Sequence, residues 1–275
     1  MKNLKISFTT MATPELDLDR EIAEAKRYGF DGIDFRMKLN NKGEIDEDIS
    51  QEDAQAILQK LDGLALPSLL CYNMKVRDGH QQMADSILKC LDVAKKLEVS
   101  AIRIFTGKLE TDEDTNVLIQ VLQEVVAKDN SDIKIAMQNH INIGVTLHQA
   151  LEVCQRVNSP RVGVIVSPDH AIRIGENIAE ILPGLMPYVI QLYVVDVNEN
   201  NDCVLFGDGC IHFSDILDVL LENGFCGYVT LKWEKCWHPN LPAYPEAFHS
   251  FLEWLYTYCV TVQNPMSLLK KEGEF

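Results

Sequence analysis

Short apolar segments alternate with longer amphipathic segments along the whole chain. The short segments, such as VGVIV and VIQLYVV, are continuous and rich in β-branched residues, which is typical of strands covered on both faces. Eight strands are predicted, at Leu4 to Thr9, Gly32 to Arg36, Leu66 to Cys71, Ala101 to Phe105, Lys134 to Gln138, Val162 to Val166, Val189 to Val195 and Tyr228 to Lys232.

A helix is predicted after every strand. The expected helices cover Pro14 to Tyr28, Ser50 to Leu61, Gln81 to Leu97, Thr111 to Ala127, Thr146 to Val157, Glu176 to Leu182, Phe213 to Asn223 and Tyr244 to Tyr258. Connections of this length cannot be hairpins, so the strands should be parallel. We predict a closed (β/α)8 TIM barrel. The alternative is an open doubly wound sheet, but no G-x-G-x-x-G motif follows the first strand.

Local signals place several helix ends. Ser50, with an acid three residues later, is a plausible N-cap, and Gly29 is a plausible stop. Pro183 and Gly184 are expected to close the sixth helix.

Length and composition fit one globular domain. The 275 residues are 47% hydrophobic and 24% charged, and no Gly/Ser linker divides them. We therefore predict a single domain, residues 1–275, in which residues 260–275 form a tail that covers a barrel end or a partner subunit, consistent with a homo-oligomer.

The net charge and the pattern of cysteines indicate which partners and which cellular compartment to expect. A net charge of −16 argues against nucleic-acid binding, which relies on basic residues to neutralise phosphates. The eight cysteines include no C-x-x-C pair and are expected to be free thiols in a reducing compartment. The sequence shows neither a signal-peptide core nor a membrane-length apolar run, so we expect a cytoplasmic protein without a membrane partner.

Polar residues gather where the predicted strands end. The carboxyl ends of barrel strands meet on one rim, which carries the active site in this architecture. The stretch Tyr228 to Pro239, YVTLKWEKCWHP, begins as a buried strand and ends in charged and aromatic residues. The residues expected at this rim are Arg36, Tyr72, Asn73, Arg103, Gln138, Asn139, His140, Ser167, Asp169, His170, Tyr193, Asp196, Lys232, Glu234, Trp237 and His238.

Several motifs occur in order at matching strands. They are ISFTTMATPEL at the first strand, YGFDGIDFR at the second, GDGCIHF (207–213) before the seventh helix, and WEKCWHP after the eighth strand. Together they resemble the xylose isomerase-like TIM barrels, a superfamily of sugar-phosphate isomerases and epimerases that also includes endonuclease IV. The resemblance implies a small carbohydrate as the ligand.

The resemblance also implies a divalent cation, held by Glu, Asp, His and Glu from strands five to eight. At the matching places this chain has Gln138, Ser167, Tyr193 and Lys232. An amide, a hydroxyl, a phenol and an ammonium are poor ligands for a dication. We therefore expect no metal cofactor, and a cluster of mutually hydrogen-bonded polar groups in which Lys232 supplies the positive charge. This departure also disfavours endonuclease activity.

A relocated metal site is the alternative. His140, Asp169 and Glu234 each lie two residues beyond a replaced ligand, so their side chains would keep the same strand face. We favour the metal-free interpretation, since the family also carries residues of this kind beside its metal.

The candidate roles divide into two groups. Catalytic candidates are Lys232, Glu234, Tyr193 and Asp196. Candidates for binding substrate are Gln138, His140, Ser167, His170, Arg36, Arg103, Trp237 and His238. Some have structural alternatives, since the arginines could pair with neighbouring acids and the tryptophans could pack in the core.

Three functions remain open from the sequence. The first is a sugar isomerase or epimerase that works without the metal. The second is an enzyme that forms a Schiff base through Lys232, and the third is a non-catalytic sugar-binding or regulatory barrel. The identity of the sugar does not follow from the residues.

Overall fold

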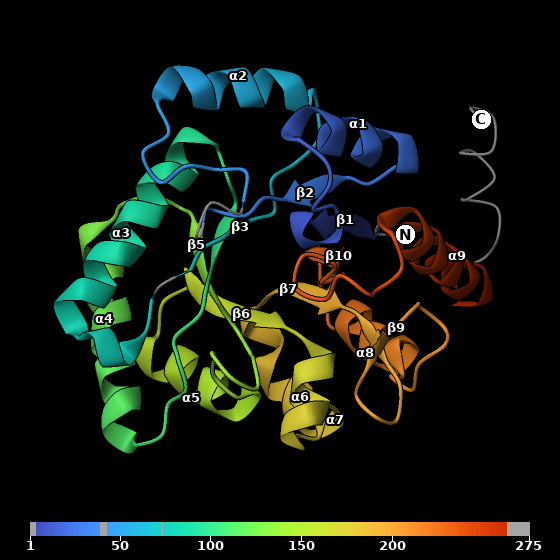
Figure 1. The fold of residues 1–275 in the computed structure, drawn as a ribbon. Coiled ribbons are helices and arrows are strands. Elements are labelled where there is room, and N and C mark those ends of the chain that lie inside the picture. The colour runs from blue at the N-terminus through green and yellow to red at the C-terminus, as the bar shows by residue number, and fades with distance from the viewer. Residues whose placement is uncertain (1–3, 39–42, 73, 263–275) are drawn as a thin grey trace.

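Eight parallel strands form a barrel surrounded by helices in a computed structural model of the chain, which describes residues 4–38, 43–72 and 74–262 (Figure 1). The predicted (β/α)8 barrel is confirmed. The strand order is β2-β1-β10-β7-β6-β5-β4-β3. The strands are β1 (Lys5–Thr9), β2 (Gly32–Asp34), β3 (Ser68–Leu70), β4 (Ala101–Ile104), β5 (Lys134–Gln138), β6 (Val162–Val166), β7 (Val189–Val194) and β10 (Tyr228–Leu231).

The helices lie outside the strands and bury one apolar face each. In α3 the buried residues Met83, Ile87, Leu91 and Ala94 recur at helical spacing. The α-helices are α1 (Leu18–Tyr28), α2 (Gln51–Leu61), α3 (His80–Lys96), α4 (Asp112–Lys128), α5 (Leu147–Val157), α6 (Pro168–Ile174), α7 (Ile178–Leu185), α8 (Phe213–Glu222) and α9 (Tyr244–Val262). Short 3-10 turns occur at Thr10–Ala12, Val76–Asp78 and Met186–Tyr188. No helix among the described residues has the length and apolarity needed to cross a membrane.

Two helix signals are confirmed and one is wrong. Ser50 Oγ accepts the backbone N–H of Asp53 at 3.0 Å, and Gly29 ends α1 with a φ of 74°. Pro183, in contrast, lies inside α7. That helix is short and buries Leu182 and Leu185 on either side of the proline, so packing outweighs one lost hydrogen bond.

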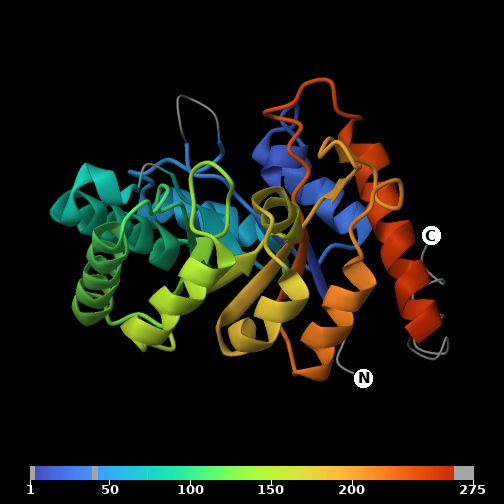
Figure 2. The same ribbon diagram turned by 90° about the horizontal axis from the view of Figure 1, so that it is seen from below.

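Two elements at the rim were not predicted. Helix α6 begins directly after β6, with Pro168 in its first turn, where a missing N–H is tolerated. A small antiparallel hairpin, β8 (Asp196–Val197) and β9 (Cys203–Val204), follows β7. Figure 2 shows the loop before α9 projecting on the same side of the barrel as this hairpin. Asn73 and residues 263–275 of the expected tail lie outside the described residues; residues 260–262 belong to α9.

The barrel closes between β2 and β3 through isolated contacts. Pro67 has no backbone N–H to donate at this seam. The carboxylate of Asp34 instead accepts the backbone N–H of Ser68 at 3.0 Å. Isolated parallel bridges join the strands at Gly32 with Ala65 and at Arg36 with Leu70. The fully buried carboxyl group of Asp34 thus adds to the backbone hydrogen bonds that join the two strands here.

The barrel interior next to this seam is polar. Gln191 Nε2 lies 2.6 Å from Asp34 Oδ2 and 2.5 Å from Thr230 Oγ1, and Thr230 Oγ1 lies 2.7 Å from Ser7 Oγ. Tyr193, two residues further along β7, adds to this polar interior, and its hydroxyl lies 2.9 Å from Ser68 Oγ. All of these side chains are buried, so the hydrogen bonds replace contacts with water.

Candidate functional site

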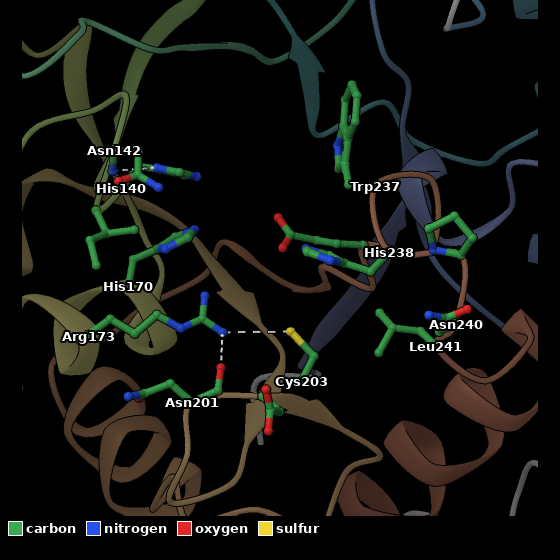
Figure 3. A pocket seen from close by; sticks show the side chains of 14 residues that line it. His140, Asn142, His170, Arg173, Asn201, Cys203, Trp237, His238, Asn240 and Leu241 are labelled. Atoms are coloured by element: carbon green, nitrogen blue, oxygen red, sulfur yellow. Dashed lines mark hydrogen bonds between the residues drawn. The ribbon is translucent and has the colours of Figure 1, made fainter.

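Two adjoining cavities, of about 640 Å³ and about 330 Å³, occupy the rim at the carboxyl ends of the strands. They share His140, Glu234, Trp237 and His238 as lining residues. In Figure 3 the two histidines His140 and His170 face Trp237 and His238 across the larger cavity. The larger cavity also includes Arg173, Asn142, Asn201, Asp202 and Cys203, and the smaller one Met11, Tyr72, Arg103, Phe105, Gln138 and Ile143.

Lys232 lies beneath these cavities with its side chain fully buried. Its Nζ donates to Asp169 Oδ2 at 2.9 Å and contacts His170 Nε2 at 3.0 Å. Glu234 Oε1 lies 3.8 Å away. A buried ammonium requires such partners, because isolated charges are strongly disfavoured away from water. The chain thus holds a fixed positive charge of its own at the barrel mouth.

His170 is held as a neutral imidazole. An ammonium has only hydrogens to offer, so His170 Nε2 must accept and the proton resides on Nδ1. Burial and the charge of Lys232, together with His140 and Arg173, lower the pKa of His170 well below its usual range. Its Nδ1 lies 3.7 Å from Asp169 Oδ2, beyond hydrogen-bond distance.

His140 is neutral in the opposite tautomer. Its Nδ1 accepts the backbone N–H groups of Asn142 at 3.0 Å and Ile143 at 3.3 Å, so Nε2 carries the proton. Burial, Lys232 and Arg103 lower the pKa of His140 to about 3. Because His140 lines both cavities, its Nε2–H is a neutral donor available to a ligand.

Glu234 is the carboxylate that both cavities share. Its side chain keeps 15% of its surface exposed, whereas that of Asp169 is fully buried. Trp237 is 42% exposed on the opposite wall and offers a flat apolar face of the kind that carbohydrate rings pack against. Trp233 instead packs in the core and donates its indole N–H to the carbonyl of Pro242.

The four residues at the expected metal-ligand positions do not form one hydrogen-bonded cluster. Gln138 Nε2 donates to Ser167 Oγ at 3.0 Å, as expected for this pair. Tyr193 lies deeper and bonds Ser68, and Lys232 turns to Asp169 and His170. The expectation of a mutual network was therefore wrong. The reason is that Tyr193 and Lys232 have other buried partners, which β3 and α6 supply.

The two candidate arginines differ sharply. Arg36 donates to Glu44 Oε1 at 2.7 Å and to Thr10 Oγ1 at 3.3 Å, so it has a structural partner and lies outside both cavities. Arg103 points into the smaller cavity, with its guanidinium over the rings of Tyr72 and Phe105.

The model for the family described as xylose isomerase-like TIM barrel matches residues 22–257. The chain belongs to this family. Inosose isomerase from Halalkalibacterium halodurans is 24% identical over 242 residues, which cover 82% of this chain and 84% of that protein. Inosose isomerase from Bacillus subtilis is 28% identical over 242 residues, with coverages of 82% and 86%. The crystal structure of IOLI protein with a bound zinc atom superposes with a TM-score of 0.74 at 19% identity and covers 95% of this chain and all of that one.

In this xylose isomerase-like barrel the residues at the expected metal positions do not fit a divalent cation. Zinc takes thiolate, imidazole and carboxylate ligands. Here the ammonium of Lys232 would repel the ion, and the Tyr193 phenol is turned toward Ser68. The alternative site around His140, Asp169 and Glu234 gains no support. Within the part of the chain that the structure describes, no group of three or more His, Cys, Asp or Glu residues is placed to hold a metal.

Asp196, a catalytic candidate, organises the loop after the hairpin. One carboxylate oxygen accepts the backbone N–H groups of Gly207 and Gly209, each at 3.1 Å. The other accepts those of Val197 at 3.0 Å and Ile211 at 3.4 Å. A Cβ at position 209 would lie 2.0 Å from this carboxylate, so the GDG sequence permits the close approach.

The Asp196→Ala variant should reduce the protection of this loop against hydrogen exchange. Removing a buried anionic acceptor leaves the amides of Gly207 and Gly209 without their partner. We expect their hydrogen exchange to accelerate at least about tenfold, since a charged hydrogen bond contributes roughly 1.5–3 kcal/mol. Asp208→Ala, in the same loop, is the control and should keep wild-type exchange. Unchanged protection in Asp196→Ala would contradict the structural role.

Sequence reasoning missed two contributors to the site. Arg173 lines the larger cavity and lies 3.3 Å from Asp169, one turn earlier in α6. The i, i+4 spacing of these residues was visible, but the helix that makes it meaningful was not predicted. Phe105 packs against both Arg103 and His140. From the sequence, Phe105 was interpreted only as the last apolar residue of a strand.

Proposed function

We propose that this protein is a sugar isomerase- or epimerase-like barrel that binds a small carbohydrate at the rim and works without a divalent cation. The observation that carries the proposal is the ammonium of Lys232, fully buried and bonded to Asp169 and His170 at the position where the family expects a metal ligand. A fixed cation there favours negative charge on a bound ligand, as a metal would.

Glu234 is the proposed general base. Isomerisation and epimerisation beside a carbonyl begin with transfer of a proton from carbon to a base. The carboxylate of Glu234 would take that proton and return it to the same or the neighbouring carbon. The Nε2–H of His140 would donate to the carbonyl oxygen as negative charge develops on it. Both groups line both cavities, which supports their action on one ligand.

The activity of the two inosose isomerases supports a ketone substrate. Two relatives, covering 82% of this chain, are inosose isomerases. An inosose is a cyclic polyol with one ketone, so its C–H bonds beside the carbonyl are acidified. We propose a polyhydroxylated ketone of this general kind as the substrate.

A Schiff base through Lys232 receives less support. A carbonyl carbon could reach its Nζ only by displacing Asp169 and His170 from a fully buried site.

The setting we propose is a reducing cytoplasm. All eight cysteines are free thiols in the structure, which supports that environment.

Proton exchange tests the proposal directly. The protein is incubated with inosose or a ketohexose in D₂O that contains EDTA. We expect hydrogen beside the carbonyl to be replaced by deuterium, and NMR measures this exchange. Glu234→Gln should slow this exchange about a hundredfold, the scale of general base catalysis, while ligand binding persists. Glu253→Gln, at an exposed position of α9, is the matched control. Exchange that requires an added dication would overturn the metal-free proposal. Binding with no exchange would instead show the non-catalytic, sugar-binding alternative.

A further inference from the structure

Arg103 is a buried guanidinium at the floor of the smaller cavity. It lies in β4, where its register partner on β5 is Ala136, a residue of the barrel interior. The residue is 1% exposed, and its guanidinium carbon lies 3.9 Å from the ring centre of Phe105 and 4.8 Å from that of Tyr72. These aromatic contacts fix the plane of the side chain.

This cation lacks an anionic partner within the described part of the chain. Its Nε and Nη1 have no hydrogen-bond partner, and no described carboxylate lies within ion-pair distance of it. Arg36, the other strongly buried arginine of the rim, pairs with Glu44 at 2.7 Å. Arg161 and Arg173 likewise contact Asp129 and Asp169. Burying an unpaired charge is costly, so Arg103 is poised to receive an anion.

We propose that Arg103 binds a carboxylate of the substrate, so that the polyhydroxylated ketone proposed above also carries an acid group and is a sugar acid. The proposal rests on the proposed function, in that the smaller cavity is taken to hold a carbohydrate. A guanidinium offers a planar fork that matches both oxygens of a carboxylate.

The chemistry of the cavity favours a carboxylate over a phosphate. Arg103 is the sole Lys or Arg among the described residues that line this cavity, and Glu234 is the sole Asp or Glu among them. A phosphate dianion would leave one negative charge unpaired there. A carboxylate carries one charge, which one guanidinium matches.

The same placement orients the rest of the ligand. Gln138, His140 and Glu234 line the cavity together with Arg103. A carboxylate bound at Arg103 would therefore leave the neighbouring hydroxyl and carbonyl groups to face the proposed base and donor. Orientation of this kind reduces the entropic cost of reaching the reactive geometry.

Paired acid and amide ligands provide the test. Calorimetry would compare glucuronate with glucuronamide and gluconate with gluconamide, which differ in charge but little in shape. We expect the wild-type protein to bind at least one acid about tenfold or more tightly than its amide, because a charged bidentate contact is roughly twice as strong as a neutral one. Arg103→Gln should bring that ratio close to one. Arg103→Lys keeps the charge without the fork and should give an intermediate ratio, which preserves the test if the glutamine variant fails to fold.

The outcomes separate this inference from the proposed function. Equal binding of acid and amide, together with deuterium exchange in a neutral ketose, would overturn the carboxylate site and leave the isomerase proposal standing. A wild-type ratio in both arginine variants would also overturn it. Tighter binding of glucose 6-phosphate than of either acid would assign the site to phosphate instead. Failure of all carbohydrates to bind would overturn both proposals.

Discussion

Replacement of Lys232 by methionine is expected to lower the free energy of unfolding by about 3 kcal/mol, the usual scale for breaking a buried ion pair. The variant removes the ammonium that lies 2.9 Å from Asp169 and 3.0 Å from His170. The carboxylate of Asp169 would then remain fully buried, with Arg173 at 3.3 Å as its remaining ion-pair contact. Methionine has a similar length and flexibility, so the loss reports on charge rather than on packing.

Removal of the second charge should restore most of this loss. In Lys232→Met with Asp169→Asn neither member of the fully buried Lys232–Asp169 pair carries a charge, so the double variant should be more stable than Lys232→Met alone. Urea unfolding of the wild type, both single variants and the double variant measures the coupling. Lys128→Met, which removes an exposed pair with Glu124, is the control and should leave the unfolding free energy nearly unchanged. A double variant that simply adds the two single losses would show that Lys232 is not stabilised by Asp169.

The fold was readable from the sequence because each of its elements has a local cause. Parallel strands covered on both faces are continuous apolar runs, and the caps at Ser50 and Gly29 are determined by neighbouring residues. The prediction failed where tertiary packing determines where a helix begins or ends. Pro183 stays inside α7 because the residues around it are buried against the barrel, and α6 starts at a proline directly after β6.

The site was readable only as a set of residues on one rim. The resemblance to the family marked Lys232 as a departure, and His140, Glu234, Trp237 and His238 line both cavities at the rim. Their partners could not be predicted. Arg36 follows β2 and Arg103 lies near the carboxyl end of β4, yet one has an acid beside it and the other has no described acid within ion-pair distance. That difference depends on a loop glutamate and on the direction of the backbone, which spacing along a strand does not reveal.

Asp34 is expected to make the stability of the barrel fall as pH rises toward neutrality. Burial raises the pKa of this carboxyl to about 7, against hydrogen bonds from Ser68, Gln191 and Tyr193 that lower it. Its ordinary value is 3.8. Between these two values the folded protein holds a proton that the unfolded chain has released, so the free energy of unfolding decreases with increasing pH. The shift of about 3 pKa units corresponds to about 4 kcal/mol across the window.

The polar layer of the barrel can accommodate the protonated form. Gln191 Oε1 has no hydrogen-bond partner, whereas its Nε2 lies 2.6 Å from Asp34 Oδ2 and 2.5 Å from Thr230 Oγ1. Rotation of this amide by half a turn would let the carbonyl oxygen accept a proton from the Asp34 carboxyl and another from the Thr230 hydroxyl. A neutral Asp34 would therefore be fully hydrogen-bonded at the seam between β2 and β3.

Asp34→Asn isolates this effect because an amide does not titrate. Relative to the wild type, the variant should gain about 3 kcal/mol of stability between pH 5 and pH 8, which is most of the titration window. Urea unfolding at the two pH values measures the change, and comparison with the wild type cancels the general effect of the net charge of −16. The control is Asp129→Asn. Although burial raises the pKa of Asp129, its contacts with Lys95, Ser131 and Arg161 lower it more, so its titration lies below this range. A stability difference for Asp34→Asn that is the same at both pH values, or larger at pH 5, would show that Asp34 is ionised throughout and that the seam is held by a charged carboxylate.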